Sequence, residues 1–186
     1  MKITETKIRS KSVFSDDKEH RLLLHKEWDK QKPSAMIIMI NPNSADDLNT
    51  DTTTMLVMNN LNRLGYGSVD IVNLYTKITS KIQFRFNSDE DLLHPENDKT
   101  IAESAKKSDK IILAWGSIGN HNQRIKDRQK AVLELLKPFS DKLYQIGENG
   151  YHPLTPIIRN NWELISYKFE EEENEENSDT GTDSEA

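Results

Sequence analysis

Four short segments rich in apolar residues divide the chain, at residues 36–40, 69–74, 110–115 and 142–146. The first of them reads Met-Ile-Ile-Met-Ile, with no polar residue. Short runs of this kind are typical of strands that are covered on both faces of a sheet. The pattern therefore predicts four strands, of which those at 36–40 and 110–115 are buried.

Between these runs, apolar residues recur every three or four positions, as on the buried side of a helix. One such segment covers residues 52–64 and should end at Gly65, because glycine adopts left-handed backbone angles without a Cβ penalty. A second helix should begin near Pro95, and a third covers residues 122–136. Residues 75–95 follow no clear period, and residues 21–28 fit a strand or a short helix equally well.

The alternation of strands and helices predicts a parallel sheet between two layers of helices. The expected fold class is α/β, a three-layer αβα sandwich around a four-stranded parallel sheet. Residues 1–169 should form a single domain, because the sequence contains no internal repeat and no linker long enough to divide it.

Polar residues or glycines follow each predicted strand. These segments are Asn41-Pro42-Asn43-Ser44, Asn73-Leu74-Tyr75, Trp115-Gly116-Ser117 and, in the loop after the last strand, Tyr151-His152-Pro153-Leu154. Ligands of open α/β sheets bind outside the carboxyl ends of the strands. We therefore expect the four segments to form one site.

Each segment also has a purely structural interpretation. Asn43 or Ser44 could cap a turn by accepting hydrogen bonds from nearby backbone amides. Asn73 could satisfy loop amides from a buried position, Trp115 could belong to the core, and His152 could brace a proline-containing loop. The shared placement of the segments, more than any single residue, favours a binding site.

Missing motifs argue against several other chemistries. The chain has no glycine-rich phosphate loop, no Gly-x-Ser-x-Gly motif and no cysteine, and its five histidines lack the spacing of zinc ligands. Asp46, Asp47 or Asp51 could bind a divalent ion, but acidic loop residues are more often only solvated. We therefore expect neither a metal nor a cofactor.

Charge is distributed unevenly along the chain. Residues 170–186 hold nine of the 31 acidic residues and no Lys or Arg, which leaves 22 acidic against 25 basic residues in the rest. The net charge of −6 therefore becomes +3 for the body of the protein. The tail has no apolar residue before Ala186, so we predict that it is disordered. It could promote solubility or act as an acidic decoy over a basic groove.

No segment approaches the ~20 apolar residues of a membrane span, and the first eleven residues lack the apolar core of a signal peptide. We expect a soluble, cytoplasmic protein that does not bind membranes.

As a set, the motifs resemble those of the DUF1643 family over most of residues 20–158. They are Asn41-Pro42-Asn43-Ser44-Ala45-Asp46, Asp51-Thr52-Thr53, Val72-Asn73-Leu74, Pro95-Glu96-Asn97-Asp98, Ala114-Trp115-Gly116 and His152-Pro153-Leu154. The family usually has serine at the position of Asn43 and proline at the position of Thr52. Because the family is named as a domain of unknown function, this resemblance implies no reaction.

Three of the motifs are also similar to those of uracil-DNA glycosylases, especially the mismatch-specific branch, and occur in the same order at strand ends. Met39-Ile40-Asn41-Pro42-Asn43 is similar to a Gly-Ile-Asn-Pro-Gly motif, Ala114-Trp115-Gly116 to Leu-Trp-Gly, and His152-Pro153-Leu154 to His-Pro-Ser. The resemblance implies a uracil-DNA glycosylase-like fold and cleavage of the N-glycosidic bond of a nucleobase.

The resemblance also implies roles for individual residues. Asn41 would position the attacking water, and His152 would donate to the oxygen of the leaving base or approach the phosphates. An amide orients water but is a poor base, so catalysis would depend mainly on positioning and electrostatics. Asn73 could read the edge of a base, since an amide both donates and accepts. The residues expected to bind substrate are Asn43, Ser44, Asp51, Asn73, Tyr75, Asn97, Asp98, Trp115 and Gly116.

Some features separate the chain from DNA glycosylases. Leu154 offers at most part of their apolar wedge, the body is only weakly basic, and the first loop has no evident stacking aromatic, although Tyr75 could replace it. The predicted function is hydrolysis of an N-glycosidic bond in nucleic acid or a nucleotide. The alternatives are a non-catalytic module that binds a nucleotide or modified base, and an interaction protein whose acidic tail mimics DNA.

Overall fold

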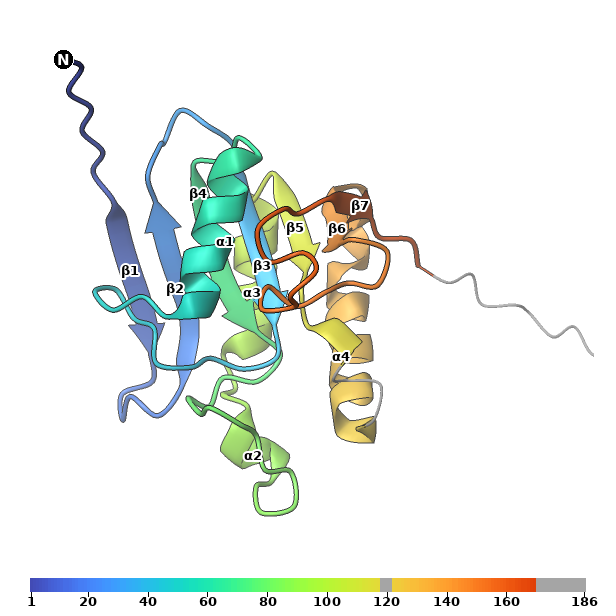
Figure 1. Cartoon of the computed structure of the whole chain (residues 1–186). Coiled ribbons are helices and arrows are strands. Elements are labelled where there is room, and N and C mark those ends of the chain that lie inside the picture. Colours follow the sequence, from blue (N-terminus) through green and yellow to red (C-terminus); the bar gives the residue numbers. More distant parts are fainter. Residues whose placement is uncertain (118–121, 170–186) are drawn as a thin grey trace, which may run out of the picture.

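The computed structural model describes residues 1–117 and 122–169. Within them, seven strands form one sheet in the order β1-β2-β4-β3-β5-β6-β7 (Figure 1). The strands are β1 (Arg9–Phe14), β2 (Arg21–Glu27), β3 (Ser34–Met39), β4 (Ser68–Asn73), β5 (Lys110–Leu113), β6 (Leu143–Ile146) and β7 (Leu164–Ser166). The tail that we predicted to be disordered, residues 170–186, lies outside the described residues.

The four predicted strands are β3 to β6, and they pair in parallel at the centre of the sheet. The prediction of a four-stranded, all-parallel sheet was wrong, because β1 and β2 add antiparallel strands at one edge and β7 adds one at the other. β1 and β7 are edge strands of partly exposed residues, so their sequences contain no apolar run. The α/β class itself is confirmed.

Helices cover both faces of the sheet (Figure 1). They are α1 (Thr52–Arg63), α2 (Asp89–Leu92), α3 (Asn97–Lys107) and α4 (Gln123–Leu136), and the last continues into a 3₁₀ segment, η2 (Lys137–Lys142). α1 packs on one face of the sheet, while α3 and α4 pack on the other. The three longer helices begin within two residues of the predicted positions. Among the described residues, no helix has both the length and the apolar character needed to cross a membrane.

The two helical layers explain the unbroken apolar sequence of β3, since successive side chains of a strand point to opposite faces. Met36 and Ile38 pack in the core under α3 and α4, whereas Ile37 packs in the core under α1. All three side chains are completely buried.

The segment that the sequence left open between strand and helix forms β2. It runs antiparallel to β4, with Leu24 opposite Ile71. The first residue of β2, Arg21, therefore lies at the edge of the sheet where the central parallel strands end, and its backbone N–H donates to the carbonyl of Thr76 just after β4. β2 thus brings a cation to the edge at which we expected the site.

Candidate functional site

A small pocket opens at the carboxyl ends of the parallel strands, on the α1 face. Its lining residues are Arg21, Met39, Asn41, Asn43, Asp51, Thr53, Thr54 and His152. Four of the predicted site residues, Asn41, Asn43, Asp51 and His152, therefore lie together. The cavity volume is about 40 Å³, well below the roughly 300–1,000 Å³ of small-molecule sites, so the pocket has room for a small group only.

Asn41 follows β3 and uses one end of its amide to hold the surrounding loops. Its Nδ2 donates to the carbonyl oxygens of Pro42, at 3.2 Å, and Thr79, at 2.6 Å. Its Oδ1 has no hydrogen-bond partner among the described residues. Since the donor end is occupied, Asn41 offers the pocket a hydrogen-bond acceptor.

His152 lies in the loop after β6, and its Nδ1 accepts a hydrogen bond from the backbone N–H of Leu154 at 3.2 Å. In the neutral imidazole the proton must then be on Nε2, which is left as a donor. Burial lowers the pKa of His152 below its ordinary value of 6.5, although the negative charge of Asp51 opposes the shift. The side chain is therefore a neutral donor near pH 7.

Gly116, a predicted binding residue, lies directly behind His152. Its φ of +67° is in the left-handed region, and a Cβ at this position would lie 3.1 Å from the Cβ of His152. Its N–H donates to the carbonyl of Gly150 at 3.0 Å, which holds the two loops together. Gly116 thus helps to place the imidazole without lining the pocket.

Asp51 caps the amino end of α1. Its Oδ1 accepts the backbone N–H of Thr54 at 2.7 Å, as expected for an N-cap residue. No hydrogen bond to the described residues occupies its other carboxylate oxygen. The helix N-terminus and one free carboxylate oxygen therefore lie at the same side of the pocket.

Arg21 is the pocket residue that the sequence analysis missed. Its side chain is only 3% exposed, and its Nη1 donates to the carbonyl of Ala45 at 2.5 Å. Burial lowers the pKa of the guanidinium to about 10, while Asp51 and Asp46 oppose this shift. An arginine ahead of three leucines was the available signal. It could not be used, because the antiparallel pairing that places β2 beside β4 was not predicted.

A second cation of β2, Lys26, helps Arg21 to fix the loop between β3 and α1. Its Nζ donates to the carbonyls of Asp46 and Asp47, at 3.0 and 3.1 Å. The carboxylate of Asp46 accepts hydrogen bonds from the backbone N–H groups of Leu48 and Asn49, so it stabilises the loop turn. In the described part of the chain, no three His, Asp or Glu side chains form a group that could hold a metal ion.

The structure does not bring four other predicted residues to this pocket, because their contacts are on the α3 and α4 face of the sheet. Tyr75 packs in that core and donates to the carbonyl of Arg124 at 3.0 Å. Asn97 donates to the carbonyls of Asn73 and Leu74, at 3.0 and 3.3 Å, so it secures the end of β4.

Asp98, also on α3, forms an ion pair with Arg128 of α4, and Trp115 packs against the same core. These residues support the sheet edge from behind. Ser44 lies in the loop after β3, but it is exposed and does not line the pocket.

Asn73 is an unusual case. It ends β4, pairs with Met39 of the pocket wall, and is only 1% exposed. Neither its Nδ2 nor its Oδ1 has a hydrogen-bond partner within the described residues. By strand alternation it points to the α1 face, like Val69 and Ile71, but it does not line the pocket. Asn73 therefore does not form the hydrogen bonds to loop amides that were considered above. A buried amide without partners costs free energy.

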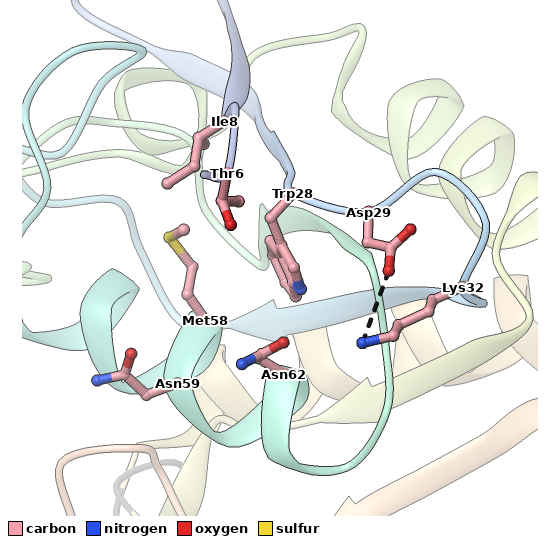
Figure 2. A pocket seen from close by; sticks show the side chains of 8 residues that line it. All are labelled: Thr6, Ile8, Trp28, Asp29, Lys32, Met58, Asn59 and Asn62. Atoms are coloured by element: carbon pink, nitrogen blue, oxygen red, sulfur yellow. Dashed lines mark ion pairs between the residues drawn. The ribbon is translucent and has the colours of Figure 1, made fainter. Parts of the chain in front are cut away.

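A larger pocket, of about 290 Å³, lies at the other end of the sheet (Figure 2). It is lined by Thr6, Ile8, Trp28, Asp29, Lys32, Met58, Asn59 and Asn62. The N–H groups of Trp28 and Asp29 donate to the carbonyl of Gly67, which precedes β4, so this pocket is at the amino ends of the parallel strands. Its charged groups, Asp29 and Lys32, pair with each other at 3.6 Å. Size alone therefore does not make it the candidate site.

Comparison with known proteins identifies a family but no better-characterised relative. The family model described as Protein of unknown function (DUF1643) matches residues 21–154, well over half of the chain. None of the curated proteins and none of the solved structures compared with the chain matches it. The matched range contains all the residues that line the small pocket.

Proposed function

We propose that this chain, which belongs to the family described as Protein of unknown function (DUF1643), hydrolyses the N-glycosidic bond between a nucleobase and its sugar. One observation carries the proposal. Asn41 and His152, from distant parts of the sequence, line one pocket at the carboxyl ends of the parallel strands. The first presents an acceptor for water, and the second presents a neutral donor.

Asn41 would orient the attacking water. Because its Nδ2 is held by the carbonyls of Pro42 and Thr79, its Oδ1 would accept a hydrogen bond from that water. The oxygen of the water bonds to the anomeric carbon, and the free carboxylate oxygen of Asp51 would take the proton that the water loses. Orientation of this kind lowers the barrier mainly in the transition state.

His152 would stabilise the leaving base. As the glycosidic bond breaks, its electron pair moves to the base, and negative charge spreads to the base oxygen. The Nε2–H of neutral His152 would donate to that oxygen, while the Asp51 carboxylate would stabilise the positive charge that develops on the sugar. The two charges of the transition state would thus each meet a complementary group.

The arrangement of the sheet supports the same reaction. β4, β3, β5 and β6 are parallel and lie between α1 on one face and α3 and α4 on the other. The resemblance to uracil-DNA glycosylases implies a parallel core of this kind between helices. A uracil-DNA glycosylase-like fold is therefore part of the proposal, with β1, β2 and β7 as additions to that core.

A module that binds a nucleotide or modified base without hydrolysis is the second candidate. The observation that favours it is Asn73, whose amide has no partner among the described residues and shares a face with Met39. An amide can pair with the edge of a base, and this recognition does not require turnover.

A base-release assay tests the proposal. The full chain is incubated with nucleosides, nucleotides and single- and double-stranded oligonucleotides, and the released bases are separated by chromatography. We expect release from at least one class, its loss in Asn41→Ala, and normal activity in Asn59→Ala. Asn59 is a matched control, because it is an exposed asparagine that lines only the distant pocket of Figure 2. A ligand that binds but is never cleaved would favour the binding module instead.

A further inference from the structure

Arg21 has more hydrogen-bonding capacity than the structure uses. Nη1 donates to Ala45, but Nε is buried without a partner, and Nη2 forms no hydrogen bond with any described residue. Arg21 is only 3% exposed, and a partly paired guanidinium in such a position is costly, because each buried donor without a partner loses its hydrogen bonds to water. Arg21 lines the small pocket, where a ligand could accept hydrogen bonds from the unused Nη2.

The amino end of α1 lies at the same pocket. Of its first N–H groups, that of Thr54 donates to the Asp51 side chain and that of Met55 to the Asp51 carbonyl. Those of Thr52 and Thr53 donate to none of the described residues, and Thr53 lines the pocket. α1 is twelve residues long, so the dipoles of its peptide groups add up to a partial positive charge of roughly half an elementary charge at its amino end. Free amides at such a terminus bind oxyanions.

The charges around the pocket limit what kind of anion fits. Arg21 is positive, Asp51 is negative, and His152 is neutral near pH 7. Arg21 and Asp51 attract each other, but they do not form an ion pair within 4.0 Å. The helix terminus and Arg21 therefore attract an anion, while Asp51 opposes a second negative charge. A singly charged oxyanion satisfies all these groups.

We propose that Arg21 and the first turn of α1 form a subsite for a singly charged phosphate group. The planar guanidinium can donate two parallel hydrogen bonds to two phosphate oxygens, and the amide of Thr53 can donate to another. The body charge of only +3 favours a free nucleotide, whose phosphate monoester is singly charged below its second pKa of about 6, over a long nucleic acid strand. The identification of the phosphate carrier as a nucleotide rests on the proposed function, whereas the anion subsite does not.

Inorganic phosphate is the probe for the subsite. At pH 6, where its singly charged form dominates, the full chain is titrated by calorimetry against chloride of equal ionic strength. Saturable binding to the wild type is expected. The phosphate affinity of Arg21→Lys should be at least tenfold lower, because an ammonium group cannot donate two parallel hydrogen bonds to two oxygens. Arg63→Lys is the matched control. Arg63 is an exposed arginine in the last turn of α1 and does not line the pocket, so the same substitution there should leave phosphate binding as in the wild type.

A second measurement needs only the wild type and so does not depend on the folding of a variant. In an amide NMR titration with inorganic phosphate, the saturating shifts should include Thr52 and Thr53. Shifts confined to surface lysines, or equal phosphate affinity in the wild type and Arg21→Lys, would overturn the subsite. So would the absence of saturable binding.

The assay with nucleotides separates this inference from the proposed function. Base release from nucleosides and nucleoside monophosphates at equal rates would overturn the phosphate subsite and leave the hydrolase standing. Phosphate binding that depends on Arg21, without release of any base, would keep the subsite and remove the hydrolase. Release only from oligonucleotides would replace the free nucleotide with a nucleic acid strand and overturn that part of the proposal.

Discussion

Asn41 shows how one side chain can be both structural and functional. Its Nδ2 ties the loop after β3 to the carbonyl of Thr79, which explains why a buried strand ends in a polar residue. The same residue lines the pocket, and its Oδ1 has no hydrogen-bond partner among the described residues. The turn and the site, which were alternatives for this sequence segment, are therefore compatible in one residue.

The burial of His152 should make the unfolding free energy of the protein depend on pH. The pKa of the folded protein is lowered from 6.5, so the unfolded chain takes up this proton first as the pH falls. The resulting contribution to stability is present above pH 6.5 and is lost as the pH falls through the lower, folded pKa. Between pH 7.5 and 5, the wild type should therefore lose more unfolding free energy than His152→Asn.

Denaturant unfolding at each pH measures this difference. Asn is the appropriate replacement, because it can still accept the N–H of Leu154 but does not titrate. The pKa of His20 is also lowered by burial, but His20 is present in both proteins and its effect cancels. Parallel pH profiles for the two proteins would contradict the assignment of a buried, neutral His152.

Sequence reasoning at the residue scale succeeded for some of the residues that follow a predictable strand and failed for others. Asn41 and Asn43 follow β3, and their position at the pocket could be predicted from the buried run before them. Tyr75 and Trp115 also follow strands but point to the other face. A difference of one residue reverses the face, and a strand end cannot be predicted to within one residue.

At the scale of elements, a close backbone approach links β4 to the turn between β2 and β3. Gly67 donates to the carbonyl of Pro33, and a Cβ on Gly67 would lie 1.8 Å from the carbonyl oxygen of Asp29. Gly67→Ala should therefore force the two segments apart and destabilise the protein by about 3 kcal/mol or more.

Gly65→Ala is the matched comparison for this prediction. Gly65 has a φ of +89°, but its Cβ would have no neighbour within 4 Å. Its replacement should cost only the backbone penalty of about 1–2 kcal/mol. Urea unfolding gives the stability of both variants. An equal loss of stability in the two would show that the close contact with Asp29 does not exclude a Cβ at position 67.

The accuracy of the element predictions followed burial. β3 and β5 are covered on both faces, so their apolar runs identified them. β1 has the sequence Arg-Ser-Lys-Ser-Val-Phe and is partly exposed, so it has no such signal. β2 was left undecided between strand and helix because its leucines fit either, and only its pairing with β4 decides the matter.

At the scale of the whole molecule, the parallel centre of the sheet could be predicted from the alternation of elements, but its antiparallel edges could not. Because β2 brings Arg21 to the pocket, the unpredicted antiparallel pairing also left Arg21 out of the predicted site. A site built only from loops that follow parallel strands lacks this cation. Long-range pairing between β2 and β4 is set by the folded chain, and no local sequence pattern encodes it.

In the proposed reaction, Asn41 and His152 act together on one glycosidic bond. The most direct test of this proposal is a double-mutant cycle on a substrate that the wild type hydrolyses, with single-turnover rates and binding constants for Asn41→Ala, His152→Ala and the double variant. Each single change should lower the rate by about 10²–10³-fold, with affinity reduced only a few-fold. The combined loss should be smaller than the product of the two, because both residues serve one transition state. Wild-type rates of base release in both single variants would contradict the account.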